Sequence, residues 1–453
     1  MYQTMAQAYQ FLIIGLGVTG LSVARFLHRR GISFAVADNS EQPSQHQALL
    51  EFAPKTQVYT GDIKAAYLEQ AEQVVVSPGV PLKTLEAIQA NTKKDKFIGD
   101  IELFARYAPQ CPIATITGTN GKSTVASLLT DAAKCAGLNV ASGGNLAGEN
   151  SHSMPALDLI ERYRDVELYV LELSSFQLET IYSLQPSVSV ILNIKPDHLD
   201  RYESFADYRD AKLRIHRNSA VVVVNREEDI AMQINESARQ LSFGLDQAPV
   251  GHFGVIEKEE VRHIAFGDEL LIPESDIMLV GDVGLLNTQA MFAMGHSLGL
   301  PFDAMCSAAR NFHGLAHRMQ HIGCRNGVDW YDDSKATNVS ATCAALNAID
   351  RPIVLIAGGL GKGEDFKLLS DLAESKVRTT MLLGKDAEQI AAALEGRVPY
   401  TRVENMEQAV LYAADAARPG DCVLLSPACA SLDMYRNYKE RGEAFKSAYK
   451  KLS

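Results

Sequence analysis

The sequence predicts an α/β fold in which crossover helices connect the strands of parallel sheets. Short apolar runs alternate with longer segments of helical spacing along most of the chain, and turns rich in glycine or serine follow many of these runs. A chain of 453 residues has room for about two to four domains. Its content of 47% hydrophobic and 22% charged residues is that of a globular protein, which excludes wholesale disorder and fibrous repeats.

Three blocks of strands and helices follow one another along the chain. A connector with two prolines at residues 106–112 places the first boundary near residue 100. After the middle block, residues 246–276 predict short strands and residues 287–298 predict a helix. The strands expected in the middle and last blocks span residues 113–116, 168–173, 188–194, 221–224, 328–331, 353–357, 379–383 and 422–425.

Charge and cysteine content limit the partners and the compartment. The net charge of −12 argues against nonspecific binding to nucleic acid or to an anionic membrane. No apolar run approaches the roughly 18 residues of a membrane span, and the apolar stretch 11–26 is broken by glycines and lacks the preceding basic residues of a signal peptide. Seven cysteines without a C-x-x-C pair favour reduced thiols. We therefore expect a cytoplasmic protein with no nucleic-acid partner and no membrane insertion.

The first block contains a glycine pattern that is typical of nucleotide binding. A strand at residues 11–14 leads into Gly15-x-Gly17-x-x-Gly20 and a helix, and Asp38 follows the next strand. This is the dinucleotide fingerprint, which by itself predicts NAD. The same glycines serve any diphosphate, however, and a second nucleotide loop lies further along the chain. A nucleotide-linked substrate is therefore the competing ligand.

That second loop spans residues 117–124 and follows a strand of the middle block. Its glycines allow backbone N–H groups to surround phosphate oxygens, Lys122 would reach the terminal phosphates, and Ser123 or Thr124 would ligate Mg²⁺. The standard phosphate-loop spacing requires glycine at position 116, where this chain has Ile116. A helix cap with a chance lysine is the alternative, and we favour phosphate binding.

Polar residues also follow the next two strands of the middle block. Glu172 lies at the end of one apolar run and His198 follows the next. Because the carboxyl ends of parallel strands meet at one edge of a sheet, we expect both side chains near the phosphate loop, where Glu172 would hold Mg²⁺. A structural histidine is the alternative for His198. The residues around Lys212, on a later helix, predict a lysine that is exposed to solvent.

Three polar turns follow strands of the last block. Lys335, Lys362 and Ser431, one from each turn, would line a pocket for a substrate that carries carboxylates. Each residue alone has a polar loop as its alternative. Cys429 has no histidine nearby in the sequence, so a structural thiol is favoured over a nucleophile.

Together these motifs resemble those of the Mur ligases. The resemblance covers nearly the whole chain and rests on residues 117–124, 171–179, 197–198 and 332–338. Residues 333–338 and 426–433 are most similar to the branch of the family that adds D-glutamate. The resemblance implies three domains: an N-terminal Rossmann-like UDP-binding domain over residues 1–100, a central P-loop ATPase-like domain over residues 101–314, and a C-terminal Rossmann-like, amino-acid-binding domain over residues 315–453.

The resemblance also implies a reaction. ATP would phosphorylate the carboxylate of UDP-N-acetylmuramoyl-L-alanine to an acyl phosphate, and D-glutamate would attack it, a step of peptidoglycan precursor synthesis. The enzyme is expected to be a cytoplasmic monomer that uses Mg²⁺ at two sites. Lys212 matches a lysine that is carbamylated in the family, and the carbamate would be a metal ligand, which replaces the solvated reading.

The resemblance assigns the site residues to four groups. The residues with catalytic roles are Lys122, Glu172, His198 and Lys212, and the metal ligands are Ser123, Glu172, His198 and carbamylated Lys212. ATP would contact Gly118, Thr119, Asn120, Gly121, Lys122, Ser123, Thr124, Asn287, Arg318 and Asp333. The UDP-linked substrate would contact Val18, Thr19, Asp38, Asn39, Gly79, Asn145 and His198. D-Glutamate would contact Lys335, Thr337, Lys362, Ser431 and Leu432.

One departure from the family pattern concerns the nucleotide site. The family usually has His-Asn four and three residues before the position of Asn287, whereas this chain has Val283 and Gly284. We expect activity to survive, and Gly284→Asn to leave turnover possible. A sister ligase of the Mur or folylpolyglutamate type, which adds another amino acid, and a nucleotide-binding protein without turnover are the alternative functions.

Overall fold

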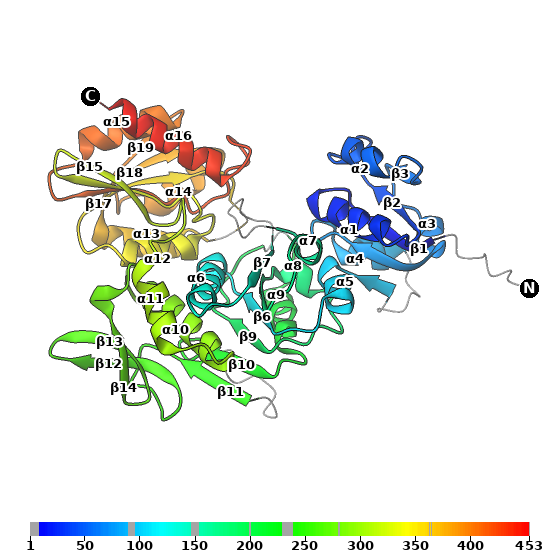
Figure 1. Cartoon of the computed structure of the whole chain (residues 1–453). Helices are drawn as coiled ribbons and strands as arrows, with labels where there is room; N and C mark the ends of the chain where they lie inside the picture. Colours follow the sequence, from blue (N-terminus) through cyan, green and yellow to red (C-terminus); the bar gives the residue numbers. More distant parts are fainter. Residues whose placement is uncertain are drawn as a thin grey trace, which may run out of the picture. The chain divides into compact units, whose positions relative to one another are not determined.

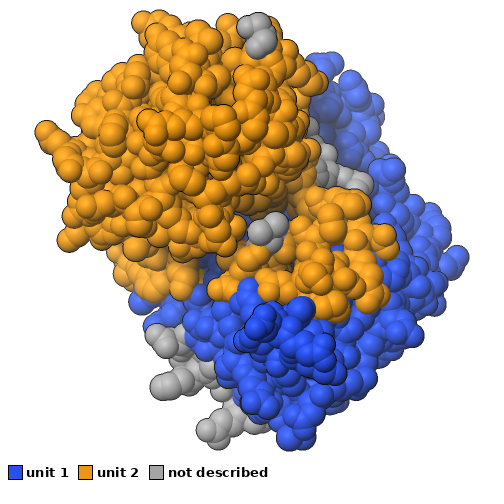
Figure 2. Space-filling view, turned by 90° about the vertical axis from the view of Figure 1, so that its left-hand side faces the viewer, with its two compact units in different colours: residues 1–193, 206–272, 288–309 blue, residues 194–205, 273–287, 310–453 orange. Residues whose placement is uncertain are grey.

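A computed structural model describes the chain at residues 9–88, 96–145, 154–198, 201–228, 239–279, 281–361, 363 and 365–452. The chain forms two compact units, coloured separately in Figure 2. The first unit comprises residues 1–193, 206–272 and 288–309, and the second comprises residues 194–205, 273–287 and 310–453. Among the described residues, no helix combines the length and the apolar content needed to cross a membrane.

The first unit begins with a five-stranded parallel sheet of order β3-β2-β1-β4-β5 (Figure 1). The apolar runs are buried because helices cover the sheet, and residues such as Leu12 and Ile14 are fully buried in its core. The strand order reverses at β1, so the glycine turn after β1 lies at a switch point, where such sheets bind ligands. The elements are β1 Tyr9–Ile14, α1 Val18–Arg29, β2 Phe34–Asp38, α2 His46–Phe52, β3 Val58–Thr60, α3 Ala65–Glu69, β4 Ala71–Val76, α4 Leu82–Ile88 and β5 Phe97–Ile98.

A second, six-stranded parallel sheet follows in the same unit, with the order β11-β10-β9-β6-β8-β7. β6 therefore lies between β9 and β8, and the three strand ends expected to meet do lie side by side in this sheet. The elements are α5 Asp100–Tyr107, β6 Ile113–Thr117, α6 Lys122–Cys135, β7 Val140–Gly144, α7 Ala156–Arg162, β8 Leu168–Glu172, α8 Ser175–Leu178, β9 Val188–Ile191, α9 Phe205–Leu213, η2 Arg214–His216, β10 Val221–Asn225 and β11 Arg239–Phe243.

The irregular stretch forms the small sheet β12-β13-β14, as the sequence predicts. The helix expected at residues 287–298 begins six residues earlier than predicted. Gly281 starts this helix at φ +72°, a conformation that the sequence pattern did not reveal. The elements are β12 Phe253–Lys258, β13 Val261–Phe266, β14 Glu269–Pro273, η4 Glu274–Asp276, α10 Gly281–Ser297 and α11 Phe302–Asn311.

Most of the second unit is a six-stranded sheet of order β15-β16-β20-β17-β18-β19, parallel except for β15 (Figure 1). One face packs on α12, α13 and α14, and the other packs on α15 and α16. Its turns after β16, β17 and β20 all lie at the carboxyl edge. The elements are β15 Gln320–Arg325, β16 Val328–Asp332, α12 Val339–Asn347, β17 Ile353–Gly358, α13 Lys367–Lys376, β18 Val377–Leu383, α14 Ala387–Leu394, β19 Tyr400–Arg402, α15 Met406–Ala416, β20 Cys422–Leu425 and α16 Tyr438–Lys451.

Candidate active site

The phosphate loop connects β6 to α6 and is held by a neighbouring strand end. Gly121 caps α6 with φ +86°, a left-handed conformation that favours glycine. Asn193, which follows β9, accepts a hydrogen bond from the Asn120 N–H at 2.9 Å and donates one to the Asn120 carbonyl at 3.2 Å. Its own carbonyl accepts from the Thr119 N–H at 2.9 Å. The loop conformation is therefore fixed by Asn193, a residue that the sequence analysis missed.

Two lysines converge on one carbonyl of this loop. Lys122 Nζ donates to the carbonyls of Gly118 at 2.9 Å and Thr119 at 3.0 Å. Lys212 Nζ, from α9, donates to the same Gly118 carbonyl at 2.9 Å and lies 4.7 Å from the ring centroid of Tyr208. Lys212 is only 2% exposed, so the solvated reading from its sequence surroundings is wrong. Two like charges so close together favour an anion at this position.

Glu172 stands beside the loop because of the register of two strands. Ile116 of β6 pairs with Glu172 of β8. The Glu172 Oε1 atom accepts a hydrogen bond from Asn145 Nδ2 at 2.9 Å, and the Asn145 N–H donates to the Glu172 carbonyl at 2.7 Å. The structure thus joins Asn145, expected at the UDP-linked substrate, to Glu172, expected at the metal.

The donors near this loop fit a hard divalent cation. The described residues contain no group of three His, Cys, Asp or Glu side chains that could hold a metal ion. Ser123 lies in the first turn of α6 and Glu172 ends the neighbouring strand, and hydroxyl and carboxylate oxygens are ligands that Mg²⁺ accepts. A carbamate on Lys212 would add two oxygens and keep one N–H for the Gly118 carbonyl. The donor chemistry therefore fits Mg²⁺ best when this lysine is modified.

His198 belongs to the second unit, and its meeting with Glu172 stays a prediction. It has φ +56° and is half-buried. The backbone N–H of His198 donates to Asp197 Oδ1 at 2.9 Å. The other carboxylate oxygen, Asp197 Oδ2, accepts from Asn338 Nδ2 at 3.2 Å. The histidine is therefore connected through Asp197 to Asn338, which caps helix α12.

The N-terminal glycine loop is packed against the end of β4. Ser77 Oγ donates to the Gly15 carbonyl at 2.8 Å, and an added Cβ at Gly20 would overlap that carbonyl. Asp38 accepts from the Leu16 N–H at 2.6 Å. Of the other residues expected at the UDP-linked substrate, Val18 is 54% exposed, Asn39 and Gly79 are exposed, and Thr19 is half-buried. These residues are therefore accessible to solvent and do not belong to the hydrophobic core.

In the second unit, Asp333 is buried at the end of β16. Its Oδ1 accepts from the Met319 N–H at 3.1 Å and its Oδ2 from Ser426 Oγ at 2.9 Å. Burial raises the pKa of this carboxyl to about 7, and the hydrogen bonds and the nearby guanidinium of Arg318 partly oppose that rise. Arg318 and Asp333, two of the residues expected at ATP, are therefore near one another.

The described residues among those expected at D-glutamate follow β16 and β20. Lys335 Nζ lies 4.1 Å from the ring centroid of Tyr438, and Thr337 is half-buried. Ser431 is 3% exposed, whereas Leu432 is 67% exposed, so only Leu432 presents a large apolar surface to solvent. Lys362 lies outside the described residues. A cavity of about 700 Å³ is located elsewhere, at the amino ends of β17 and β18, lined by residues 349–352 and 375–378.

The start of α10 explains the unusual residues before Asn287. Asn287 is 9% exposed and Val283 is 45% exposed. An added Cβ at Gly284 would lie 2.5 Å from the carbonyl oxygen of Leu279. A side chain at position 284 therefore requires this segment to move, and the turnover expected of Gly284→Asn stays a prediction.

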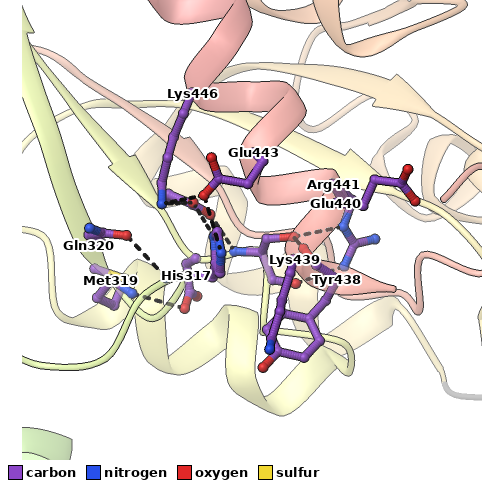
Figure 3. A network of polar contacts seen from close by, with 12 residues as sticks. His317, Met319, Gln320, Tyr438, Lys439, Glu440, Arg441, Glu443 and Lys446 are labelled. Carbon is purple, nitrogen blue, oxygen red and sulfur yellow. Dashed lines mark hydrogen bonds and ion pairs between the residues drawn. The ribbon is translucent and has the colours of Figure 1, made fainter. Parts of the chain in front are cut away.

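Sequence reasoning missed a polar network between α16 and the turn after β16 (Figure 3). Arg441 is 2% exposed and donates to Ser334 Oγ at 3.0 Å, to the Ser334 carbonyl at 2.8 Å and to the Cys429 carbonyl at 3.0 Å. Burial lowers the pKa of this guanidinium to about 10. Because α16 is rich in charged residues, its sequence suggests a solvated helix and gives no signal for Arg441.

A phosphate loop on a parallel sheet, with an acid at the next strand end and a second α/β unit that carries polar turns, defines a nucleotide-dependent α/β enzyme. Family models match the Mur ligase MurD-like N-terminal domain at residues 9–99, the Mur ligase middle domain at residues 116–295, and the Mur ligase glutamate ligase domain at residues 317–429. The chain belongs to the Mur ligase family.

Curated relatives match over nearly their full length. The UDP-N-acetylmuramoylalanine--D-glutamate ligases of Pseudomonas syringae pv. tomato and Pseudomonas aeruginosa are each 46% identical over 447 residues, which is 98% of this chain and of each relative. The ligase of that name from Nitrosococcus oceani is 44% identical and covers 97% of this chain and 96% of its own.

Solved structures share the fold at low sequence identity. MurF ligase from Thermotoga maritima, in complex with ADP, has a TM-score of 0.62 at 16% identity and covers 100% of both chains. A pseudomurein peptide ligase type C from Methanothermus fervidus has a TM-score of 0.61 at 18% identity, covering 97% of this chain and 99% of its own. The three large sheets, two in the first unit and one in the second, each correspond to one family model and give the three-domain architecture of the Mur ligases.

Proposed function

We propose that the protein joins D-glutamate to UDP-N-acetylmuramoyl-L-alanine while converting ATP to ADP and phosphate, a step of peptidoglycan precursor synthesis. The observation that carries this proposal is the 46% identity to ligases of that name over 98% of both chains. The geometry of the phosphate loop supports it, because two lysines meet at the Gly118 carbonyl and Glu172 ends the strand next to the one that leads into the loop.

The reaction proceeds in two steps. A carboxylate oxygen of the alanyl group attacks the γ-phosphorus of ATP, and ADP leaves. The amine of D-glutamate then attacks the acyl carbon and loses a proton, and phosphate leaves as the amide forms. Activation is required because a carboxylate is a poor electrophile.

The chain supplies charge and orientation for these steps. Lys122 stabilises the negative charge on the transferring phosphoryl group, and the loop amides orient the phosphates. Ser123 and Glu172 would hold Mg²⁺, His198 would be a further ligand, and the ion would supply positive charge that neutralises phosphate charge. Arg318 and Asp333 contact ATP, and Lys335 attracts a carboxylate of D-glutamate. We assign these roles to domains over residues 1–100, 101–314 and 315–453.

The test measures phosphate release from ATP and Mg²⁺ with UDP-N-acetylmuramoyl-L-alanine. Parallel reactions contain D-glutamate, L-glutamate, L-alanine or no amino acid. Release only with D-glutamate is the expected result. Release with another amino acid would point to a sister ligase, and no release with any of them would point to a binding protein or another carboxylate substrate.

Carbamylation of Lys212 is a separate part of the proposal. Its support is the burial of this lysine beside Lys122, where a neutral or negative group would relieve repulsion. Lys212→Ala is expected to lose activity at subsaturating Mg²⁺, and ¹³C-bicarbonate is expected to give a carbamate NMR signal in the wild type but not in this variant. Normal turnover by the variant would remove the carbamate, and the second metal site with it, from the mechanism.

We further propose that the enzyme works as a monomer in the cytoplasm, where its nucleotide substrates are made. Sedimentation at the assay concentration is expected to give the mass of one chain. A stable dimer would contradict this part without affecting the reaction.

A further inference from the structure

The segment that carries Arg318 has an unusual backbone. His317 has φ +61° and Met319 has φ +44°, so both neighbours of Arg318 occupy the left-handed region without being glycine. Such conformations are costly and persist only where the surroundings impose them. The contacts of this segment should therefore reveal what holds Arg318 in place.

Hydrogen bonds connect this segment to the turn after β16. His317 Nδ1 lies 2.7 Å from Asp332 Oδ2, and the His317 carbonyl accepts from the Lys335 N–H at 3.0 Å. The Met319 N–H donates to Asp333 Oδ1 at 3.1 Å. The segment and the turn thus form one assembly, in which a displacement of His317 also displaces residues expected to bind ATP.

Helix α16 completes the assembly from the other side (Figure 3). Lys446 Nζ lies 3.6 Å from Asp332 Oδ2 and 3.1 Å from Glu443 Oε1, and Glu443 Oε1 lies 3.6 Å from His317 Nε2. Asp332 is fully buried. An added Cβ at Gly442 would lie 2.8 Å from Asp332 Oδ2 and would overlap the His317 ring, so glycine permits the close approach of α16.

We propose that Lys446 is a positioning residue for ATP: it balances the charge of buried Asp332, which holds His317 and thereby the backbone on both sides of Arg318. This inference rests on the proposed function, because it takes Arg318 and Asp333 as ATP contacts. A buried carboxylate that loses its cation is strongly disfavoured. Without Lys446, the charge of Asp332 would fall more heavily on the His317 ring, which lies 2.7 Å away, and the ring would be drawn toward the carboxylate. The strained segment would then shift away from the geometry that binds ATP.

The experiment uses three variants of the full chain. Lys446→Met removes the charge and keeps the length of the side chain, Lys446→Arg keeps the charge, and Lys450→Met is the control at an exposed position of the same helix. Steady-state phosphate release gives kcat and the KM of each substrate. Calorimetry with ATP alone gives the Kd.

Lys446→Met is expected to raise the KM and Kd for ATP about 10-fold, because ATP binds more weakly in both the ground state and the transition state. The KM of D-glutamate is expected to rise less, through the Lys335 N–H that donates to the His317 carbonyl, and kcat and the KM of the UDP-linked substrate are expected to stay within about twofold. Lys446→Arg and Lys450→Met are expected to match the wild type. Unchanged ATP binding by Lys446→Met, or an equal loss for all substrates together with a lowered Tm, would overturn the inference alone. Absence of ATP binding by the wild type would overturn the proposed function as well.

Discussion

The glycine loop after β1 and the phosphate loop after β6 share one backbone plan but differ in the charges that face them. Each follows a parallel strand and leads into a helix. In the first, the Leu16 N–H donates to the carboxylate of Asp38, and residues 15–20 contain no cation. In the second, Lys122 and Lys212 both donate to the Gly118 carbonyl. Glycines thus determine the shape of such a loop, while the neighbouring side chains determine which part of a nucleotide it favours.

This difference does not by itself separate NAD from a UDP-linked substrate at the first loop, and the similarity to UDP-N-acetylmuramoylalanine--D-glutamate ligases favours the second. The backbone N–H groups of such a loop can bind a diphosphate without a cation, while the acid favours the N–H and O–H donors of a base or sugar. The paired lysines of the second loop favour the phosphates of ATP. One chain can therefore bind two nucleotides in different ways on similar backbones.

The largest effect is expected at Lys122. Lys122→Met should lower kcat by about 100-fold, because charge on the transferring phosphoryl group loses its stabilisation. Phosphate release measures this loss, and Lys134→Met, at an exposed position of the same helix, is the control. If both variants turned over normally, the charge of Lys122 would not be needed for phosphoryl transfer, and it would not explain a functional difference between the two loops.

A smaller effect, on substrate binding alone, is expected at Asp38. Asp38→Asn should raise the KM for UDP-N-acetylmuramoyl-L-alanine about 10-fold, since a charged acceptor is replaced by a neutral amide. The KM for ATP should not change. Asp62→Asn, at an exposed position of the same domain, controls for general loss of charge. A larger change in the KM for ATP than in the KM for the UDP-linked substrate would show that the first loop does not bind the UDP-linked substrate.

The shape of the first loop can be tested without touching charge. Gly20→Ala should lower the free energy of unfolding by about 1–3 kcal/mol, because the new methyl group overlaps the Gly15 carbonyl. Gly17→Ala is the matched control, since an added Cβ there meets no atom within 4 Å, and it should change stability by less than about 0.5 kcal/mol. Urea denaturation compares the two, and equal stabilities would show that the packing of Gly20 is unimportant.

The smallest expected effect is on the pH dependence of stability and concerns Asp333, which is buried, whereas Asp38 lies beside an open loop. The pKa of Asp333 is raised from 3.8 to about 7, so the folded protein keeps a proton that the unfolded chain releases in this interval. The stability that this proton contributes is complete below pH 3.8 and is lost as the pH rises through about 7. We therefore compare the Tm of the wild type with the Tm of Asp333→Asn at two pH values. The Tm of the wild type minus that of the variant should be about 2 °C larger at pH 5.5 than at pH 8. An identical difference at both pH values would contradict the buried, protonated state.

The sequence predicts the phosphate loop despite Ile116, because strand, glycines, lysine and helix appear in the right order. It also predicts that the ends of β6, β8 and β9 adjoin, since apolar runs mark these strands clearly. The short strands β3 and β19 and the glycine-rich strand β7 are less visible, because they lack a long apolar run.

Other parts of the site depend on long-range packing that no local pattern records. Lys212 lies 94 positions after Gly118, and its helix has little amphipathic character, so only the folded chain reveals its burial. The network of His317, Asp332 and Lys446 combines three distant segments, and each residue alone resembles an ordinary polar surface residue. Family resemblance identified Lys212 but not this network.

The shared carbonyl of Gly118 also has a kinetic consequence. Inorganic phosphate, a product of the proposed reaction, is an anion and is attracted to the two ammonium groups as its precursor is. Its dissociation would then limit the number of catalytic cycles per second. A carbamate on Lys212 would replace one of these cations by an anion and shorten the time for which the spent phosphate occupies the enzyme.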